Sequence, residues 1–190
     1  MGLAELDDKG KVISAKMLPG PVPGAPKRDK NWGFFSAGGK LYVDYWVSPH
    51  EVYEYDPIVG LRRQGWTTEW TGPMSHAELH GGSSPVLHDG LFWRLVHYHE
   101  AGPPTTYVAM MVAFSGKPPF EMKWVSKLPL LRGVPDPNPY RGQPQHGVIF
   151  PSSLERTSSG WRITVGVNDR KIMSAEISDA KLKRNLQRIG

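Results

Sequence analysis

His97 and His99 are the first candidates for chemistry, because they lie two positions apart at the end of the apolar segment Leu91 to His99. Alternate residues of a β-strand point to the same face, so the two imidazoles could supply two ligands of a metal ion. The common His-x-His metal site also needs a glutamate several residues later, whereas Glu100 follows His99 directly. We therefore expect no metal cofactor and keep a metal-dependent enzyme as one alternative.

Other candidate residues stand where predicted strands begin or end. They are Lys30, Asn31, Trp32, His50 and Asp169. An indole offers a flat face for stacking, and the polar groups could bind hydroxyls or anions. Each residue also has a structural alternative. The first three could turn the chain and fill a core, His50 could be a solvated turn residue, and Asp169 could bond its own backbone in a turn.

Cysteine and carboxylate usage removes several kinds of site. The chain has no cysteine, which excludes disulfide scaffolds, thiolate zinc sites and cysteine nucleophiles. Paired catalytic carboxylates need a definite separation, and sequence alone supplies no partner for Glu54, Asp56, Glu78 or Glu155. No acid and base pair is therefore predicted.

The net charge of +5 does not indicate a nucleic-acid partner. The segment from Asp179 onward contains four basic residues and one acidic residue, a net charge of +3, which leaves only +2 for the first 178 residues. A duplex-binding surface needs basic residues gathered on one face of the folded domain. The first eight residues show no export signal, and the apolar run Tyr107 to Phe114 is far shorter than the roughly 20 residues that cross a bilayer. We expect a cytoplasmic protein without a membrane or nucleic-acid partner.

The segments that would position these residues recur three times in the same arrangement. Each copy has a short apolar segment, a turn, and two longer segments rich in Val, Ile, Tyr, Phe and Trp. Such segments, bounded by Gly, Asp, Ser or Pro, are typical of β-hairpins. The copies occupy residues 31–55, 83–114 and 148–177. The pattern therefore predicts an all-β fold.

The spacing of the copies predicts a β-propeller. The turn glycines Gly39, Gly90 and Gly160 lie 51 and 70 residues apart, and the longer interval contains a Pro-rich inserted loop, residues 129–147. A period near 50 residues is typical of four-stranded antiparallel blades. We expect a single domain, residues 1–190, with about three blades and a leftover N-terminal hairpin.

One short helix is predicted at the C-terminal end, residues 178–190. Ser178 is a suitable N-cap, and Leu182, Leu186 and Ile189 follow at helical spacing, with basic residues toward the end.

In each predicted blade, the first strand starts at the same edge where the second strand ends, since the two are antiparallel. This geometry brings the candidate residues of different hairpins to one rim, where a binding mouth would form.

Several motifs together resemble the five-bladed β-propeller glycosidase superfamily. They resemble glycoside hydrolase family 130 mannoside phosphorylases and the related yeast cell-wall β-mannosyltransferases. The motifs are Lys30-Asn31-Trp32-Gly33-Phe34-Phe35, Gly39-Lys40-Leu41-Tyr42, Ser48-Pro49-His50-Glu51-Val52, Gly81-Gly82-Ser83-Ser84-Pro85 and Gly166-Val167-Asn168-Asp169. The resemblance covers nearly all of the chain and implies that the first blade and part of the second are missing.

The resemblance also implies which residues meet the sugar. Asp169 would bind sugar hydroxyls, His97 would hold phosphate or a sugar, and inorganic phosphate would be the co-substrate of a phosphorylase. The residues that would face the central depression are Lys30, Asn31, Trp32, His50, His97 and Asp169.

The sequence departs from the family at the catalytic acid. That acid lies in a Glu-Asp-Pro-Arg-like element of the first blade, which this sequence lacks, and His80 replaces the usual basic residue before Gly-Gly. We expect a carbohydrate-active protein that binds mannoside-like or related glycans, with the catalytic acid outside this chain. The alternative is a non-catalytic glycan-binding or protein-interaction module. A second chain would cover the open edge of an incomplete ring.

Overall fold

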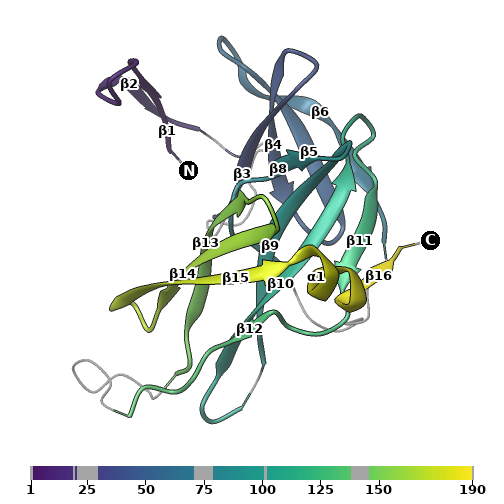
Figure 1. Ribbon diagram of the computed structural model, residues 1–190. Coiled ribbons are helices and arrows are strands. Elements are labelled where there is room, and N and C mark those ends of the chain that lie inside the picture. Colours follow the sequence, from purple (N-terminus) through teal and green to yellow (C-terminus); the bar gives the residue numbers. More distant parts are fainter. Residues whose placement is uncertain are drawn as a thin grey trace.

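The computed structural model describes residues 2–18, 20, 30–70, 79–100, 102–137 and 146–189. It confirms an all-β fold built from antiparallel sheets, with one short helix in the described part of the chain. The three predicted copies form three separate sheets that follow one another in chain order (Figure 1).

The first copy forms a four-stranded sheet in simple meander order. Its first turn contains Gly38 and Gly39, whose positive φ angles of 56° and 75° favour residues without a Cβ. The strands are β3 (Gly33–Ala37), β4 (Lys40–Trp46), β5 (His50–Asp56) and β6 (Gly60–Thr68).

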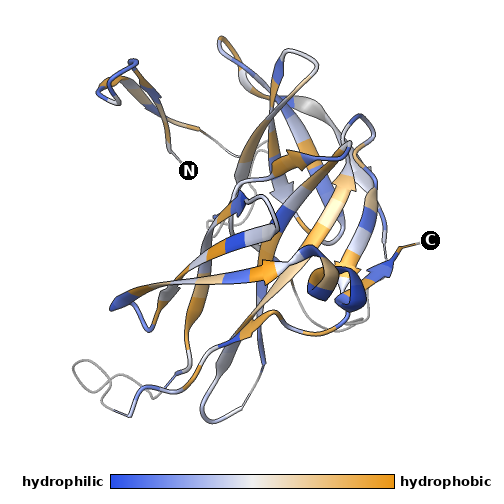
Figure 2. Ribbon diagram, in the orientation of Figure 1, coloured by the Kyte–Doolittle hydropathy of each residue, from blue (hydrophilic) through white to orange (hydrophobic). Residues whose placement is uncertain are grey.

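The second copy forms the central, seven-stranded sheet. Its main path runs β16-β11-β10-β9-β7, with β8 beside β9 and β12 beside β10. Residues Val108 to Phe114 of β10 are fully buried, as expected for a continuous apolar strand covered on both faces, and Figure 2 shows this strand as hydrophobic. The strands are β7 (His80–Gly81), β8 (Val86–His88), β9 (Leu91–Glu100), β10 (Thr106–Ser115), β11 (Met122–Ser126), β12 (Leu131–Arg132) and β16 (Leu186–Arg188).

The third copy forms a three-stranded sheet, β13 (Ile149–Arg156), β14 (Gly160–Val167) and β15 (Lys171–Ser178). Arg162 on the centre strand bridges Glu155 and Glu176 across the solvent-facing side. The opposite side carries Trp161 and Ile163, which pack against Leu95 of the central sheet.

Two hydrophobic clusters join the sheets face to face. The first lies between the four-stranded and central sheets and contains Phe35, Phe114 and Phe120. The second lies between the central and three-stranded sheets and contains Leu95 and Trp161. Successive sheets packed in this way form a partial, propeller-like array, as predicted.

The N-terminal hairpin is separate from these sheets. Strands β1 (Gly2–Leu6) and β2 (Val12–Met17) pair only with each other, and Figure 1 shows them projecting from the body. The Lys16 ammonium touches the body 5.2 Å above the Tyr55 ring. The predicted leftover hairpin is therefore present.

The inserted loop is more structured than its proline content predicts. Within residues 129–147, strand β12 pairs with β10, because Leu130 and Leu131 pack against the second cluster. Residues 138–145 of the loop lie outside the described residues.

The predicted C-terminal helix is shorter than residues 178–190. Helix α1 spans Asp179–Asn185, and strand β16 follows at once and pairs with β11. The edge of β11 offers backbone hydrogen bonds, and the extended chain lets Leu186 and Ile189 pack on two different clusters. Tertiary contacts therefore override the helical spacing of these residues. No described helix has the length and apolar character of a membrane span.

Ser178 caps α1 as predicted, since its Oγ accepts a hydrogen bond from Lys181 N at 3.3 Å. We expect Ser178→Ala to lower the free energy of unfolding by about 1 kcal/mol, because a helix N–H loses its partner. Urea denaturation monitored by fluorescence measures this change. Ser174→Ala, on the exposed part of β15, is the control, and an equal effect of both substitutions would contradict the capping role.

Candidate functional site

Three histidines from two paired strands form a compact group, which we call the histidine cluster: His80, His97 and His99. His80 on β7 is the register partner of His97 on β9. The ring centroids of His80 and His97 are 5.6 Å apart, and those of His80 and His99 are 6.3 Å apart with nearly parallel planes. The alternation of β9 thus places both of its histidines beside β7, as the i, i+2 spacing predicts.

Aromatic side chains from three sheets surround the histidine cluster. The Tyr107 ring lies 5.5 Å from His99, Phe150 lies 5.3 Å from His97, and Trp46 lies 6.0 Å from His80. All three aromatic side chains are partly exposed, as is His80, while His99 is exposed. The site therefore combines imidazoles with flat apolar faces, a composition that suits a neutral polar ligand.

His97 is the buried member of the cluster, with 5% of its surface exposed. Burial lowers its pKa from 6.5 to about 4, helped by the charges of His80, Lys30 and His99 against an opposing backbone hydrogen bond at Gly81. At neutral pH the imidazole is uncharged. Its Nδ1 atom is buried without a hydrogen-bond partner in the part of the chain that the structure describes.

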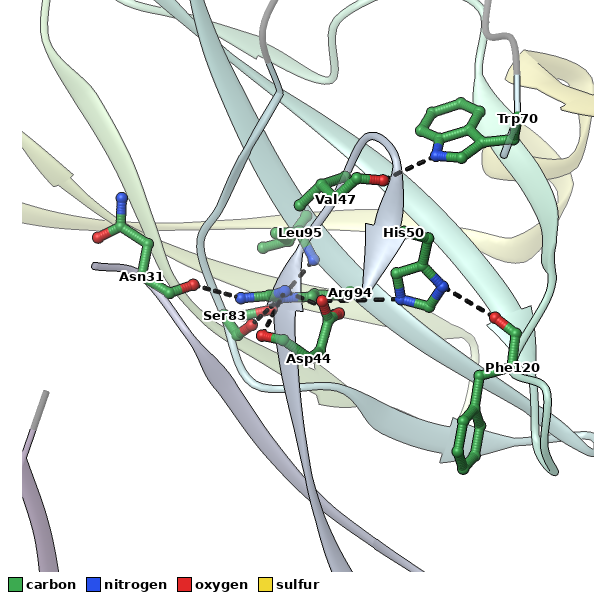
Figure 3. Close-up of polar contacts among 9 residues, drawn as sticks. All are labelled: Asn31, Asp44, Val47, His50, Trp70, Ser83, Arg94, Leu95 and Phe120. Atoms are coloured by element: carbon green, nitrogen blue, oxygen red, sulfur yellow. Dashed lines mark hydrogen bonds and ion pairs between the residues drawn. The ribbon is translucent and has the colours of Figure 1, made fainter. Parts of the chain in front are cut away.

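A buried ion pair joins the four-stranded sheet to the central sheet, and Figure 3 shows its two members, Asp44 and Arg94, together with Asn31 and Ser83. Arg94 on β9 is fully buried, and its Nη1 lies 2.7 Å from Oδ2 of Asp44 on β4. Burial alone would raise the pKa of Asp44, but Arg94 and then His50 outweigh it and hold the pKa of this carboxyl below its ordinary value. Asp44 is therefore ionised at neutral pH and balances the charge of Arg94.

Arg94 also fixes the backbone that leads to the predicted site residues. Its Nη2 donates to the Asn31 carbonyl at 2.6 Å, and its Nε donates to the Ser83 carbonyl at 2.8 Å. A Cβ at Gly81 would collide with both the guanidinium and the Asn31 carbonyl, which explains the glycine there. Gly81 thus makes room for the arginine, while a Cβ at Gly82 would collide with Pro151 and the Leu95 carbonyl.

The six predicted site residues do not all meet. Lys30 is exposed, and its charge helps to lower the pKa of His97. Asn31 contributes its backbone carbonyl to Arg94, with a positive φ of 67°. Trp32 is buried in a third hydrophobic cluster, which it forms with Val43 and Tyr45 on the other face of the four-stranded sheet; its ring lies 5.2 Å from that of Tyr45.

His50 and Asp169 are also apart from the histidine cluster. His50 is buried, with Nδ1 2.8 Å from the Phe120 carbonyl and Nε2 3.6 Å from Asp44, so it has no surface for a ligand in this structure. Asp169 is exposed in a turn with a φ of 52°. The neighbouring Asn168 fixes this turn, since its Oδ1 accepts a hydrogen bond from Val148 N at 2.8 Å.

Sequence reasoning missed the role of the ion pair and of the surrounding aromatic residues. A signal for the pair was present: Asp44 and Arg94 are lone charges inside the apolar strand segments 41–47 and 91–99. A charge at such a position is buried with the strand and needs a partner. The sequence does not say which charge pairs with which, because the two strands belong to different sheets.

Metal binding finds no support in the geometry of the described residues. No group of three or more His, Asp or Glu side chains among them lies close enough to hold a metal ion.

Comparison with known proteins identifies a fold but no family. No family model matches the chain, and no curated protein matches it either. One similar solved structure is a β-1,2-mannobiose phosphorylase from Listeria innocua in complex with β-1,2-mannobiose, with a TM-score of 0.59 and 16% identity over 84% of this chain.

A second similar structure is a protein from Parabacteroides distasonis assigned to the glycoside hydrolases, with a TM-score of 0.56 and 18% identity over 81% of this chain. The matches cover 47% and 51% of those two chains. This chain therefore spans about half the length of each, and it shares their fold.

Proposed function

We propose that this protein binds a mannoside-like or related glycan at the histidine cluster, within a fold of the five-bladed propeller glycosidase type. The observation that carries the proposal is the exposed His99 ring beside partly exposed His80, with the partly exposed rings of Tyr107 and Trp46 next to them. A sugar offers hydroxyls to the imidazole nitrogens and C–H faces to the aromatic rings. The similarity in fold to a structure that contains β-1,2-mannobiose supports this ligand class.

The different charges of His97 and Lys30 suit them to different groups of a ligand. A pKa of about 4 leaves His97 without charge at neutral pH, so it suits a sugar hydroxyl better than a phosphate anion. Lys30 is exposed beside it and keeps the positive charge that an anion needs. In a phosphorolytic reaction, Lys30 is thus the group in this chain best suited to meet inorganic phosphate.

The described carboxylates nearest the cluster are poor general acids. Asp44 is ionised and held by Arg94, and Glu100 is paired with Arg132. A glycosidic oxygen needs a protonated donor, which these groups do not supply. This observation favours the second candidate, a non-catalytic glycan-binding module, for the chain taken alone, with glycosidic bond cleavage dependent on an acid from elsewhere.

Thermal unfolding with β-1,2-mannobiose tests the binding proposal. At a sugar concentration one hundred times Kd we expect stabilisation of about 2.7 kcal/mol, which raises Tm by roughly 2–4 °C per kcal/mol. His99→Gln and Lys30→Gln should reduce the increase in Tm, and the remote His88→Gln should not.

Chromatography of the sugar after incubation with the protein and phosphate distinguishes the two proposed functions. A product supports an enzyme, and binding without product supports a non-catalytic glycan-binding module. No sugar-dependent shift would overturn both.

A further inference from the structure

A cavity lies away from the histidine cluster, between helix α1, strands β14 and β15, and the segment before β12. Its volume is about 570 Å³, within the roughly 300–1,000 Å³ typical of small-molecule sites. None of the histidine-cluster residues lines it. Figure 1 shows α1 directly after β15, at one side of the central sheet.

The floor of this cavity is apolar. Ile163 and Ile177 come from the three-stranded sheet, and Leu130 and Leu131 come from the opposite segment. Leu128 also lines the cavity and leaves 67% of its surface exposed. An exposed leucine at the mouth of an apolar cavity extends the surface on which a hydrocarbon chain could lie.

The border of the cavity is cationic. Lys127, Lys181 and Arg184 all line it, and no ion pair is recorded for any of them in the described part of the chain. Lys181 and Arg184 are three positions apart on α1, so they lie on the same side of the helix. Figure 2 shows most of α1 as hydrophilic.

One acidic residue, Glu176, also lines the cavity. Its Oε1 lies 3.2 and 3.1 Å from Nε and Nη2 of Arg162, which also binds Glu155. Three cations and one carboxylate therefore line the apolar hollow, which leaves an excess of positive charge among the described lining residues. A ligand that matches both features carries an anionic head and an apolar tail.

The walls are held in place before any ligand binds. Leu128 N donates to Asn185 Oδ1 at 3.0 Å, and Asn185 Nδ2 donates back to the Leu128 carbonyl at 2.9 Å. Lys127 N donates to the Asn185 carbonyl at 2.6 Å, and Leu182 anchors α1 in the second cluster. A preformed site loses little binding energy to ordering.

We propose that this cavity binds a small amphiphilic carboxylate, with its carboxylate between Lys181, Arg184 and Lys127 and its alkyl chain on the leucine and isoleucine floor. The site is independent of the glycan site, since the two share no residue. Its ligand therefore binds whether or not a sugar is present.

Calorimetric titration of the whole chain with decanoate, below its micellar concentration, tests the proposal. We expect saturable binding near one molecule per chain, and at least tenfold weaker binding of decanol, which lacks the charge. The double variant Lys181→Gln, Arg184→Gln should also bind decanoate at least tenfold more weakly, because charge-assisted hydrogen bonds are lost. Lys183→Gln removes one positive charge from α1 outside the cavity lining and should bind like the unmodified chain.

A cavity-filling variant tests the apolar half of the site without changing its charge. Ala175→Trp, on β15, should abolish binding while thermal unfolding confirms that the variant is folded. Amide chemical shifts should change in residues 127–131 and 175–185. The proposal is overturned if decanol binds as tightly as decanoate, if the double variant or Ala175→Trp retains full affinity, if the shifts map elsewhere, or if binding does not saturate.

Discussion

Replacing Arg94 with methionine is expected to lower the free energy of unfolding by about 3–5 kcal/mol. The substitution keeps a long apolar side chain but leaves Asp44 ionised and buried without a partner, with 1% of its surface exposed. It also removes the donors to the Asn31 and Ser83 carbonyls. The lost stability therefore combines an unpaired charge with two unpaired backbone acceptors.

Urea denaturation at neutral pH measures this loss. Arg162→Met is the matched control, since Arg162 bridges two carboxylates at the surface and should change stability by no more than about 1 kcal/mol. The double variant Arg94→Met, Asp44→Leu should recover part of the loss, because the uncompensated charge is removed as well. If Arg94→Met is no more damaging than Arg162→Met, the ion pair does not join the two sheets as described.

The pH dependence of stability should carry a contribution of about 3 kcal/mol from His97, as its pKa falls from 6.5 to about 4 on folding. The unfolded chain takes up a proton at this residue as pH falls below 6.5, while the folded chain resists until about pH 4. Folding is therefore favoured fully above pH 6.5, and this contribution is lost between pH 6.5 and 4. Below pH 4 the contribution no longer changes.

Urea denaturation of the unmodified chain and of His97→Gln at pH 7.5, 5.5 and 4.5 isolates this contribution. Other groups titrate in both proteins and cancel in the difference, which should shrink or reverse toward low pH. His88→Gln provides the control for a histidine outside the cluster. Parallel curves for the unmodified chain and His97→Gln would show that burial does not hold His97 neutral.

The histidine cluster illustrates how far a local pattern reaches. The i, i+2 spacing of His97 and His99 was enough to put them on one face, because strand alternation is local. His80 lies beside them because β7 pairs with β9. The charge of Lys30, which precedes β3, reaches His97 from outside the central sheet.

Asn31, Trp32 and His50 show where that reasoning stops. Proximity to the rim in sequence did not decide which way each side chain points. Trp32 turns to the third cluster, and His50 turns to Asp44 and Phe120, where burial satisfies a large ring and an imidazole nitrogen. The buried sites that Trp32 and His50 occupy are created by tertiary packing, which the sequence pattern does not contain.

The C-terminal segment gives the same lesson for secondary structure. Ser178 and the residues after it start a helix by local hydrogen bonding, which the sequence predicts. The end of that helix depends on the free edge of β11, about 60 residues earlier, where an extended chain gains hydrogen bonds that a helix could not make there.

By itself, the sequence determined the all-β class, the three hairpin copies, the helix cap and the shared face of His97 and His99, because each depends on alternation or turn chemistry within a few residues. Tertiary structure alone decided the pairing of Asp44 with Arg94, the burial that keeps His97 neutral, and the cationic border of the cavity beside α1. Charge pairing and desolvation depend on distances between sheets, and a linear pattern does not contain those distances.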